Sequence, residues 1–197
     1  MTRDAIYLFS VLGVVGQVLV AVMIVAGLLA LAGVRGPLDG IRRLLWGYEL
    51  WAAFVVAAIA TCGSLFYSQI ANFQPCELCW FQRICMYPLS ILTLLVAWHG
   101  DNRAARYLLP LPVAGACVSI YHMLIQYGAI TEPKGCFIGA PAGCGTNWIA
   151  SHPDASFGYL SIPTLALTGF LLLIGFLVLA TTGTTEETAT LPAHAER

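Results

Sequence analysis

Charged residues are scarce in this chain of 197 residues, because aspartate, glutamate, lysine and arginine together make up only 10% of it. Soluble domains carry about 25%. Positive charge is not in excess either, since the formal net charge is −1, and this excludes the basic surface with which proteins bind nucleic acid. Hydrophobic residues make up 59%, and the mean hydropathy is +0.81. The composition therefore predicts an all-α integral membrane protein of a single domain.

Five apolar runs are long enough to cross a bilayer as helices, for which about 20 residues are needed. They are residues 5–31, 50–70, 80–98, 107–127 and 159–179. The first run is longer than the apolar core of a signal peptide, which is about 7–15 residues, so we expect it to be a membrane helix. The sequence predicts an extra N-terminal transmembrane helix in residues 1–33, a four-helix core in 34–180 and a polar, disordered cytoplasmic tail in 181–197.

Arginine is unevenly distributed among the loops between these runs. The loops after the first and third runs contain Arg35, Arg42, Arg43, Arg103 and Arg106. Positively charged loops stay in the cytoplasm. The N-terminus, the short loop before residue 80 and the long loop at 128–158 are therefore predicted to be extracytoplasmic, and the C-terminus cytoplasmic.

The seven cysteines divide by position. Cys76 and Cys79 form a C-x-x-C motif in the first outer loop, and Cys136 and Cys144 lie in the second. An oxidising compartment favours disulfides over a zinc site of four thiolates, so no metal is expected. Two inert structural disulfides remain an alternative on spacing alone. The cysteines inside the apolar runs are expected to act as small apolar residues: Cys62, Cys85 and Cys117.

The C-x-x-C motif stands where a helix is predicted to begin. Pro75 is suited to open that helix, which puts both cysteines in or near its first turn, where the helix dipole favours a thiolate. Arg83 lies four residues after Cys79 and shares its helix face. A fixed cation at that distance lowers a thiol pKa, and an inert disulfide does not need one. The alternative for Arg83 is that its side chain snorkels to the membrane interface.

A second polar pair lies at the same predicted depth in the fourth run. His122 and Gln126 are four residues apart and share a helix face, and their helix runs outward while that of Arg83 runs inward. Cys79, Arg83, His122 and Gln126 are therefore predicted to form one pocket beneath the outer headgroups. The alternative for His122 is a packing histidine bonded to backbone. Such a pocket suits an apolar molecule with an electron-accepting head, a description that a lipid quinone meets.

The run CELCWFQRICMYPL, which begins at Cys76, resembles the DsbB family of disulfide-generating membrane proteins, especially its BdbC-like branch. YHMLIQ at 121–126 and FGYLSIPTLALTGF at 157–170 resemble later helices of that family, so the resemblance covers residues 50–179. It implies a four-helix transmembrane bundle of the DsbB type in the bacterial cell membrane, here with one additional N-terminal helix. It also implies a thiol:quinone oxidoreductase that reoxidises a DsbA-like, thioredoxin-fold partner and reduces ubiquinone or menaquinone.

By this resemblance Cys76–Cys79 is the disulfide linked to quinone, with Cys79 nearest the quinone and Arg83 assisting. Cys136–Cys144 is the disulfide that faces the partner. Two features depart from the family: the first helix is additional, and the second pair is closely spaced, with seven residues between its cysteines. A reductive relay, or an enzyme that resembles vitamin K epoxide reductase, is the remaining alternative. In that family the C-x-x-C motif lies late in the chain, whereas here it opens the second core helix, which favours the DsbB-like order.

Overall fold

The computed structural model describes residues 2–132, 143–147, 149 and 158–190. All its regular elements within these ranges are helices, and five of them are long and apolar enough to cross a membrane. This confirms the predicted all-α membrane fold. The elements are α1 (Thr2–Leu31), α2 (Gly36–Leu45), α3 (Glu49–Gln69), α4 (Glu77–His99), α5 (Ala105–Leu108), α6 (Pro110–Gln126) and α7 (Ile162–Thr190).

Helices α3, α4, α6 and α7 form a four-helix bundle in which each helix packs against two neighbours, in the cyclic order α3, α4, α6, α7. Leu89 of α4 and three residues of α7 are fully enclosed at its centre: Phe170, Leu173 and Leu177. One end of the bundle, where α3 and α6 finish and α4 and α7 begin, carries the C-x-x-C motif. We call it the cysteine end.

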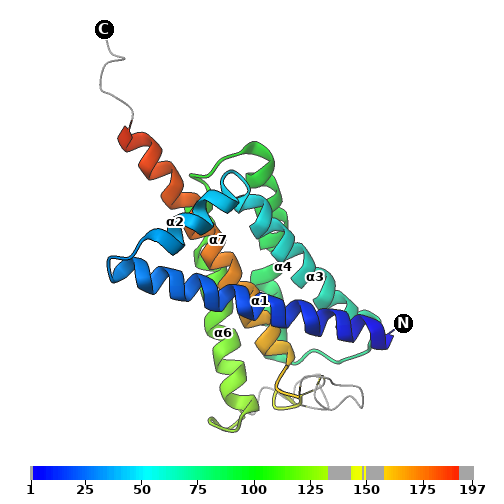
Figure 1. Ribbon diagram of the computed structural model, residues 1–197. Helices are drawn as coiled ribbons and strands as arrows, with labels where there is room; N and C mark the ends of the chain where they lie inside the picture. Colours follow the sequence, from blue (N-terminus) through cyan, green and yellow to red (C-terminus); the bar gives the residue numbers. More distant parts are fainter. Residues whose placement is uncertain (1, 133–142, 148, 150–157, 191–197) are drawn as a thin grey trace.

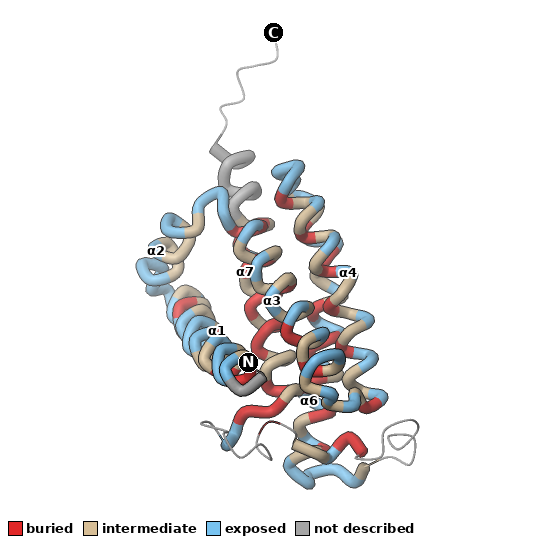
Figure 2. The backbone as a smooth tube through the Cα atoms, turned by 90° about the vertical axis from the view of Figure 1, so that its right-hand side faces the viewer, coloured by how far each residue is buried: buried red, intermediate tan, exposed pale blue. Residues whose placement is uncertain are grey.

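The additional helix α1 lies across the outside of the bundle, at a steep angle to α6 and α7 (Figure 1). It packs against α7 and α2. In Figure 2 it lies at one side of the bundle, with α2 above it and α7 on its inner side. Gly13 and Gly16 face Leu165 and Thr168 of α7. A Cβ on Gly13 would overlap the Leu165 side chain, and one on Gly16 would lie only 3.0 Å from Thr168. The absence of a Cβ thus allows the two helices to approach closely. Near the cysteine end, the Tyr159 hydroxyl donates to Gln17 Oε1 at 2.9 Å.

Three predicted details differ from the structure. Helix α2 lies in the arginine-rich loop and was not predicted. It is amphipathic and has only ten residues, which is too short to span a membrane. Cys76 is the N-cap of α4, so Pro75 precedes the first turn of that helix instead of opening it. Helix α7 continues to Thr190, so residues 181–190 are helical and the predicted disordered tail began too early. The rest of that tail, 191–197, lies outside the described residues.

The packing of α6 on α7 depends on Gly115, which has no side chain. A Cβ there would overlap the ring of Phe170, which is fully buried. We expect Gly115→Ala to destabilise the purified protein by about 1–3 kcal/mol, the usual cost of overpacking a core. The measurement is the thermal unfolding midpoint in detergent.

Gly27→Ala in α1 is the matched control, because its Cβ would meet nothing within 4 Å. Alanine is the better helix former by about 1 kcal/mol, so this variant should be neutral or slightly stabilised. Equal midpoints for the two variants would contradict the packing described here.

Candidate active site

Cys76 and Cys79 stand side by side at the start of α4, as two free thiols with their sulfur atoms 3.1 Å apart. Cys76 is the N-cap and has extended backbone geometry, and Cys79 follows in the first turn. Both lie at the positive end of the helix dipole, which favours an anionic sulfur there. The separation is longer than the roughly 2.05 Å of a disulfide, but short enough for one thiol to hydrogen-bond the other.

The environment of Cys76 favours its thiolate. The hydrogen bond with the Cys79 side chain is the largest cause, and the hydrogen bond from His122 adds to it. Burial opposes these effects, yet the balance lowers the pKa of Cys76 to about 4. The prediction placed the anion on Cys79, beside Arg83; in this reduced pair the hydrogen-bond donors converge on Cys76 instead.

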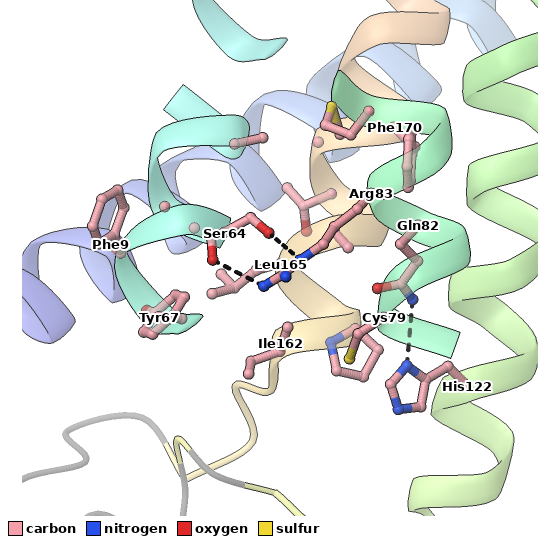
Figure 3. Close-up of a pocket in the computed structure, with 18 of the residues that line it drawn as sticks. Phe9, Ser64, Tyr67, Cys79, Gln82, Arg83, His122, Ile162, Leu165 and Phe170 are labelled. Atoms are coloured by element: carbon pink, nitrogen blue, oxygen red, sulfur yellow. Dashed lines mark hydrogen bonds between the residues drawn. The ribbon is translucent and has the colours of Figure 1, made fainter. Parts of the chain in front are cut away.

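His122 reaches the thiol pair from α6 and is only 3% exposed. Its Nε2 lies 3.0 Å from the carbonyl oxygen of Cys144 and 3.6 Å from the sulfur of Cys76. A carbonyl oxygen only accepts hydrogen bonds, so Nε2 carries the proton and points it at both groups. Nδ1 then accepts from the amide of Gln82, 3.4 Å away (Figure 3). Gln82 thereby holds the tautomer in which His122 donates toward the thiol pair.

The second cysteine loop touches the first through Cys144. This residue is disulfide-bonded and 1% exposed, and it shares an apolar cluster with Cys76 and Ile125. Its backbone amide donates to the carboxylate of Glu132, as does the amide of Gly145 at 3.3 Å. The structure therefore brings Cys144 against the C-x-x-C motif. Cys136, predicted to pair with it, lies outside the described residues.

A cavity of about 290 Å³ opens beside the thiol pair. Cys76, Cys79, Arg83 and His122 all line it, and most of its remaining wall is apolar. Figure 3 shows Cys79 and His122 on one side of it, Tyr67 and Phe9 on the other, and Arg83 between them. The predicted convergence of a cysteine, a cation and a histidine is thus found in the structure.

Arg83 is held inside the bundle by Ser64 of α3. Its Nε donates to the Ser64 hydroxyl at 3.0 Å, and Nη2 donates to the Ser64 carbonyl oxygen at 3.1 Å (Figure 3). The guanidinium carbon also lies 5.2 Å from the centre of the Trp80 ring. These contacts direct the side chain across the bundle toward α3, and they disfavour the alternative of snorkelling.

Gln126 was predicted to belong to the pocket, and the structure differs from this prediction. It is not among the described residues that line the cavity, and its amide donates to the carbonyl oxygen of Thr146 at 3.3 Å. Four residues along a helix amount to about 6 Å of rise, which takes Gln126 past the cavity to the second loop. Three described cysteines also lie away from the cavity, as expected for small apolar residues: Cys62, Cys85 and Cys117.

Three residues with clear roles in this geometry were not predicted. Gln82 is a polar residue inside an apolar run, and that signal could have identified it. Ser64 and Glu132 gave no comparable signal, because serine is common in membrane helices and an acidic residue is common in a loop. Each acts through a contact between segments distant in sequence.

The thiol pair and His122 also have the composition of a metal site, since their ligand atoms all lie within 4.8 Å of one another. Zinc holds thiolates at about 2.3 Å in a tetrahedral arrangement, which separates two sulfur atoms by roughly 3.8 Å. The observed 3.1 Å is shorter. This geometry favours reversible disulfide chemistry over metal binding.

Known proteins resemble this chain over the bundle. The family model of disulfide bond formation protein DsbB matches residues 43–181. Disulfide bond formation protein C of Bacillus subtilis is 44% identical over 132 residues, which are 66% of this chain and 90% of that protein. A probable disulfide formation protein of Deinococcus radiodurans is 39% identical over 66% of this chain and 86% of its own length. No solved structure is a significant match.

The thiolate of Cys76 generates a prediction about pH. Because its pKa is lowered to about 4, the thiolate persists as the pH falls from 8 to 5, and alkylation of the reduced protein should stay nearly constant over this range. Cys79→Ala removes the strongest hydrogen bond to that sulfur, so the rate should decline already below neutral pH. The measurement is the pH dependence of Cys76 labelling by a small alkylating reagent, read by mass spectrometry.

Cys85→Ala, a cysteine of the same helix outside the cavity, should keep the wild-type plateau. A wild-type rate that rises tenfold per pH unit from pH 5 to 8 would show an ordinary thiol and refute the arrangement.

Proposed function

This chain belongs to the DsbB family of disulfide bond formation proteins, and we propose that it is a thiol:quinone oxidoreductase that passes electrons from a thioredoxin-fold partner to a lipid quinone. The membrane location and the role in disulfide formation follow from the family and the five apolar helices. The observation that carries the finer proposal is the position of the Cys76–Cys79 pair. It stands between the second cysteine loop and an apolar cavity.

The cavity fits the head of a quinone. Its volume of about 290 Å³ is near the lower end of small-molecule sites, which run from about 300 to 1,000 Å³, so an isoprenoid tail would extend into the surrounding lipid. Arg83 has N–H groups beyond those bonded to Ser64 and can donate one to a carbonyl oxygen, and the apolar wall suits a ring. A quinone held there would accept two electrons and two protons and leave as the quinol. Ubiquinone and menaquinone both satisfy this description.

The chain's own cysteines perform the thiol–disulfide exchange. Two thiols of the reduced, DsbA-like partner exchange with the Cys136–Cys144 disulfide, so the partner leaves oxidised and both cysteines become thiols. Cys144 packs against Cys76, so we assign the next attack to the Cys144 thiolate on the Cys76 sulfur. This step forms a Cys76–Cys144 mixed disulfide and releases Cys79 as a thiolate. Cys136 then attacks Cys144, which restores the second disulfide and leaves Cys76 and Cys79 reduced.

Each remaining group has a role in returning the pair to its oxidised form. His122 directs its Nε2 proton at Cys76, which stabilises an anionic sulfur there. Arg83 lines the cavity and presents its positive charge beside Cys79. The dithiol loses two electrons and two protons as the Cys76–Cys79 disulfide re-forms. Gln126 has a different part in this scheme from the one predicted, because its bond to Thr146 anchors the second loop.

The orientation is also part of the proposal. The five loop arginines lie toward the end of the bundle opposite the cysteine end, beyond α1 and between α4 and α6. The positive-inside rule then puts that end and the C-terminus in the cytoplasm. Both cysteine loops and the N-terminus face the extracytoplasmic side of the bacterial cell membrane, where disulfides persist and a thioredoxin-fold partner can reach them.

The division of labour between the two cysteine pairs can be tested by changing the electron donor. Replacing Cys136 and Cys144 together with serine should abolish oxidation of the protein partner. Quinone reduction by a small dithiol such as dithiothreitol should persist, since that reagent reaches Cys76–Cys79 directly. The measurement is quinone absorbance during turnover with each donor.

Cys79→Ser should abolish turnover with both donors, and the triple variant Cys62→Ala, Cys85→Ala, Cys117→Ala should retain most of it. Equal loss with both donors in the Cys136 and Cys144 variant would assign that pair a structural role.

Arg83 should matter for quinone and not for folding. Arg83→Ala removes a charged donor from the cavity, so we expect kcat/KM for quinone to fall roughly ten- to a hundredfold, the effect of losing a charge-assisted hydrogen bond. Arg83→Lys should be impaired to a lesser degree, because lysine keeps the charge but lacks the planar fork that binds Ser64 at two atoms. The measurement is steady-state turnover at varied quinone concentration.

Arg106→Ala is the matched control. This arginine is exposed at the opposite end of the bundle and binds only Tyr107 among the interactions seen for it. It should leave the kinetics unchanged. If Arg83→Ala also leaves them unchanged, Arg83 is an anchor on α3 and takes no part in the cavity.

A further inference from the structure

The cavity has a wall that the family match does not account for. The DsbB model covers residues 43–181, which leaves α1 outside it, yet α1 contributes part of the cavity lining. Phe9, Gly13, Gly16 and Leu19 all face it. The cavity of this chain is therefore completed by the additional helix.

An aromatic group links α1 to the core at this wall. Phe9 lies against Gly63 of α3, where a Cβ would come within 3.1 Å of its ring. Its ring centre is 5.8 Å from that of Tyr67, one turn further along α3. On another side Tyr67 stacks on Phe73, with ring centres 5.7 Å apart and planes at 8°. Phe9 and Phe73 together fix the ring of Tyr67 at the edge of the cavity.

The hydroxyl of Tyr67 has no hydrogen-bond partner among the residues that the structure describes, although the side chain is only 5% exposed. Buried hydroxyl groups almost always have a partner, and leaving one unmade is costly. Tyr67 lines the cavity. A hydroxyl held rigidly at the wall of an apolar cavity, with a donor to spare, is suited to bind a ligand that brings its own acceptor.

We infer that α1 completes the acceptor site: Phe9 positions Tyr67, and the Tyr67 hydroxyl donates a hydrogen bond to a carbonyl oxygen of the bound quinone. This inference rests on the proposed function. A quinone ring carries two carbonyl oxygens, and the cavity has polar groups on two sides. Figure 3 places Tyr67 and Phe9 on the side away from Cys79 and His122. One carbonyl can thus face the thiol pair while the other faces Tyr67.

Tyr67→Phe separates this role from a structural one, because it removes only the hydroxyl oxygen. Without quinone, the variant should be at least as stable as wild type, since it no longer buries an unpaired polar group. Its affinity for a short-chain quinone should fall about three- to tenfold, as for the loss of one neutral hydrogen bond. The measurement is the thermal unfolding midpoint of the purified full chain in detergent, titrated with decylubiquinone and, separately, with a short-chain menaquinone analogue.

Tyr121→Phe is the matched control, since this tyrosine of α6 is 39% exposed and does not line the cavity. It should match wild type in both readouts. The role of Phe9 is tested in the same assay. Phe9→Ala should weaken quinone affinity in the wild-type background but add little to Tyr67→Phe, because it acts through the position of that hydroxyl. Leu8→Ala, an exposed neighbour outside the cavity, should have no effect.

The outcomes distinguish the role of Tyr67 from the proposed function. Wild-type protein whose midpoint does not respond to either quinone would overturn the proposed function, and this inference with it. Wild-type protein that binds quinone, together with Tyr67→Phe of unchanged affinity, would overturn this inference alone. A lower midpoint for quinone-free Tyr67→Phe with unchanged affinity would show that the hydroxyl serves the fold.

Discussion

The hydrogen bond from His122 to the carbonyl oxygen of Cys144 is the interaction on which the site depends. It joins a helix of the bundle to the second cysteine loop, and the same Nε2 proton also points at the Cys76 sulfur. One proton therefore fixes the distance between the two cysteine segments and stabilises charge on the first. Gln82 makes this arrangement definite by occupying Nδ1. A histidine with the opposite tautomer would present a lone pair to a carbonyl oxygen and to a thiolate, and would repel both.

The placement of the thiol pair explains how an anion is accommodated at the edge of a membrane protein. A thiolate deep among apolar side chains would be costly. Cys76 is buried, but it caps a helix, where the dipole and a neighbouring thiol supply partial positive charge that offsets this cost. Arg83 is held further in, by Ser64. Along α4, the thiolate is therefore stabilised by partial positive charges at the helix start, and the full positive charge of Arg83 lies further along the helix, at the cavity.

Composition and helical spacing were sufficient to predict the membrane helices and most of the pocket. Five apolar runs corresponded to the five membrane-spanning helices, and Cys79, Arg83 and His122 were placed in one pocket because opposite chain directions bring equal depths together. Spacing does not give the direction of a side chain at the end of a helix, and this misplaced Gln126. Nor does it reveal contacts made by backbone carbonyls, such as that of Ser64 with Arg83 or of Cys144 with His122. Helix α2 was missed because it is amphipathic and shorter than a span.

The crossing angle of α1 could not be predicted from the sequence either, although this angle determines which residues of α1 form a wall of the cavity. An apolar helix without polar periodicity can present any face to a neighbour. Its position is set instead by small residues, since Gly13 and Gly16 admit the side chains of α7, and by the Tyr159–Gln17 hydrogen bond near the cysteine end. In membranes such close contacts between small residues replace the hydrophobic effect as the driving force for helix association. Where this wall meets α3 and α7, the contacts seen among the described residues are mainly apolar packing, whereas His122 and Arg83, which also line the cavity, are held by hydrogen bonds.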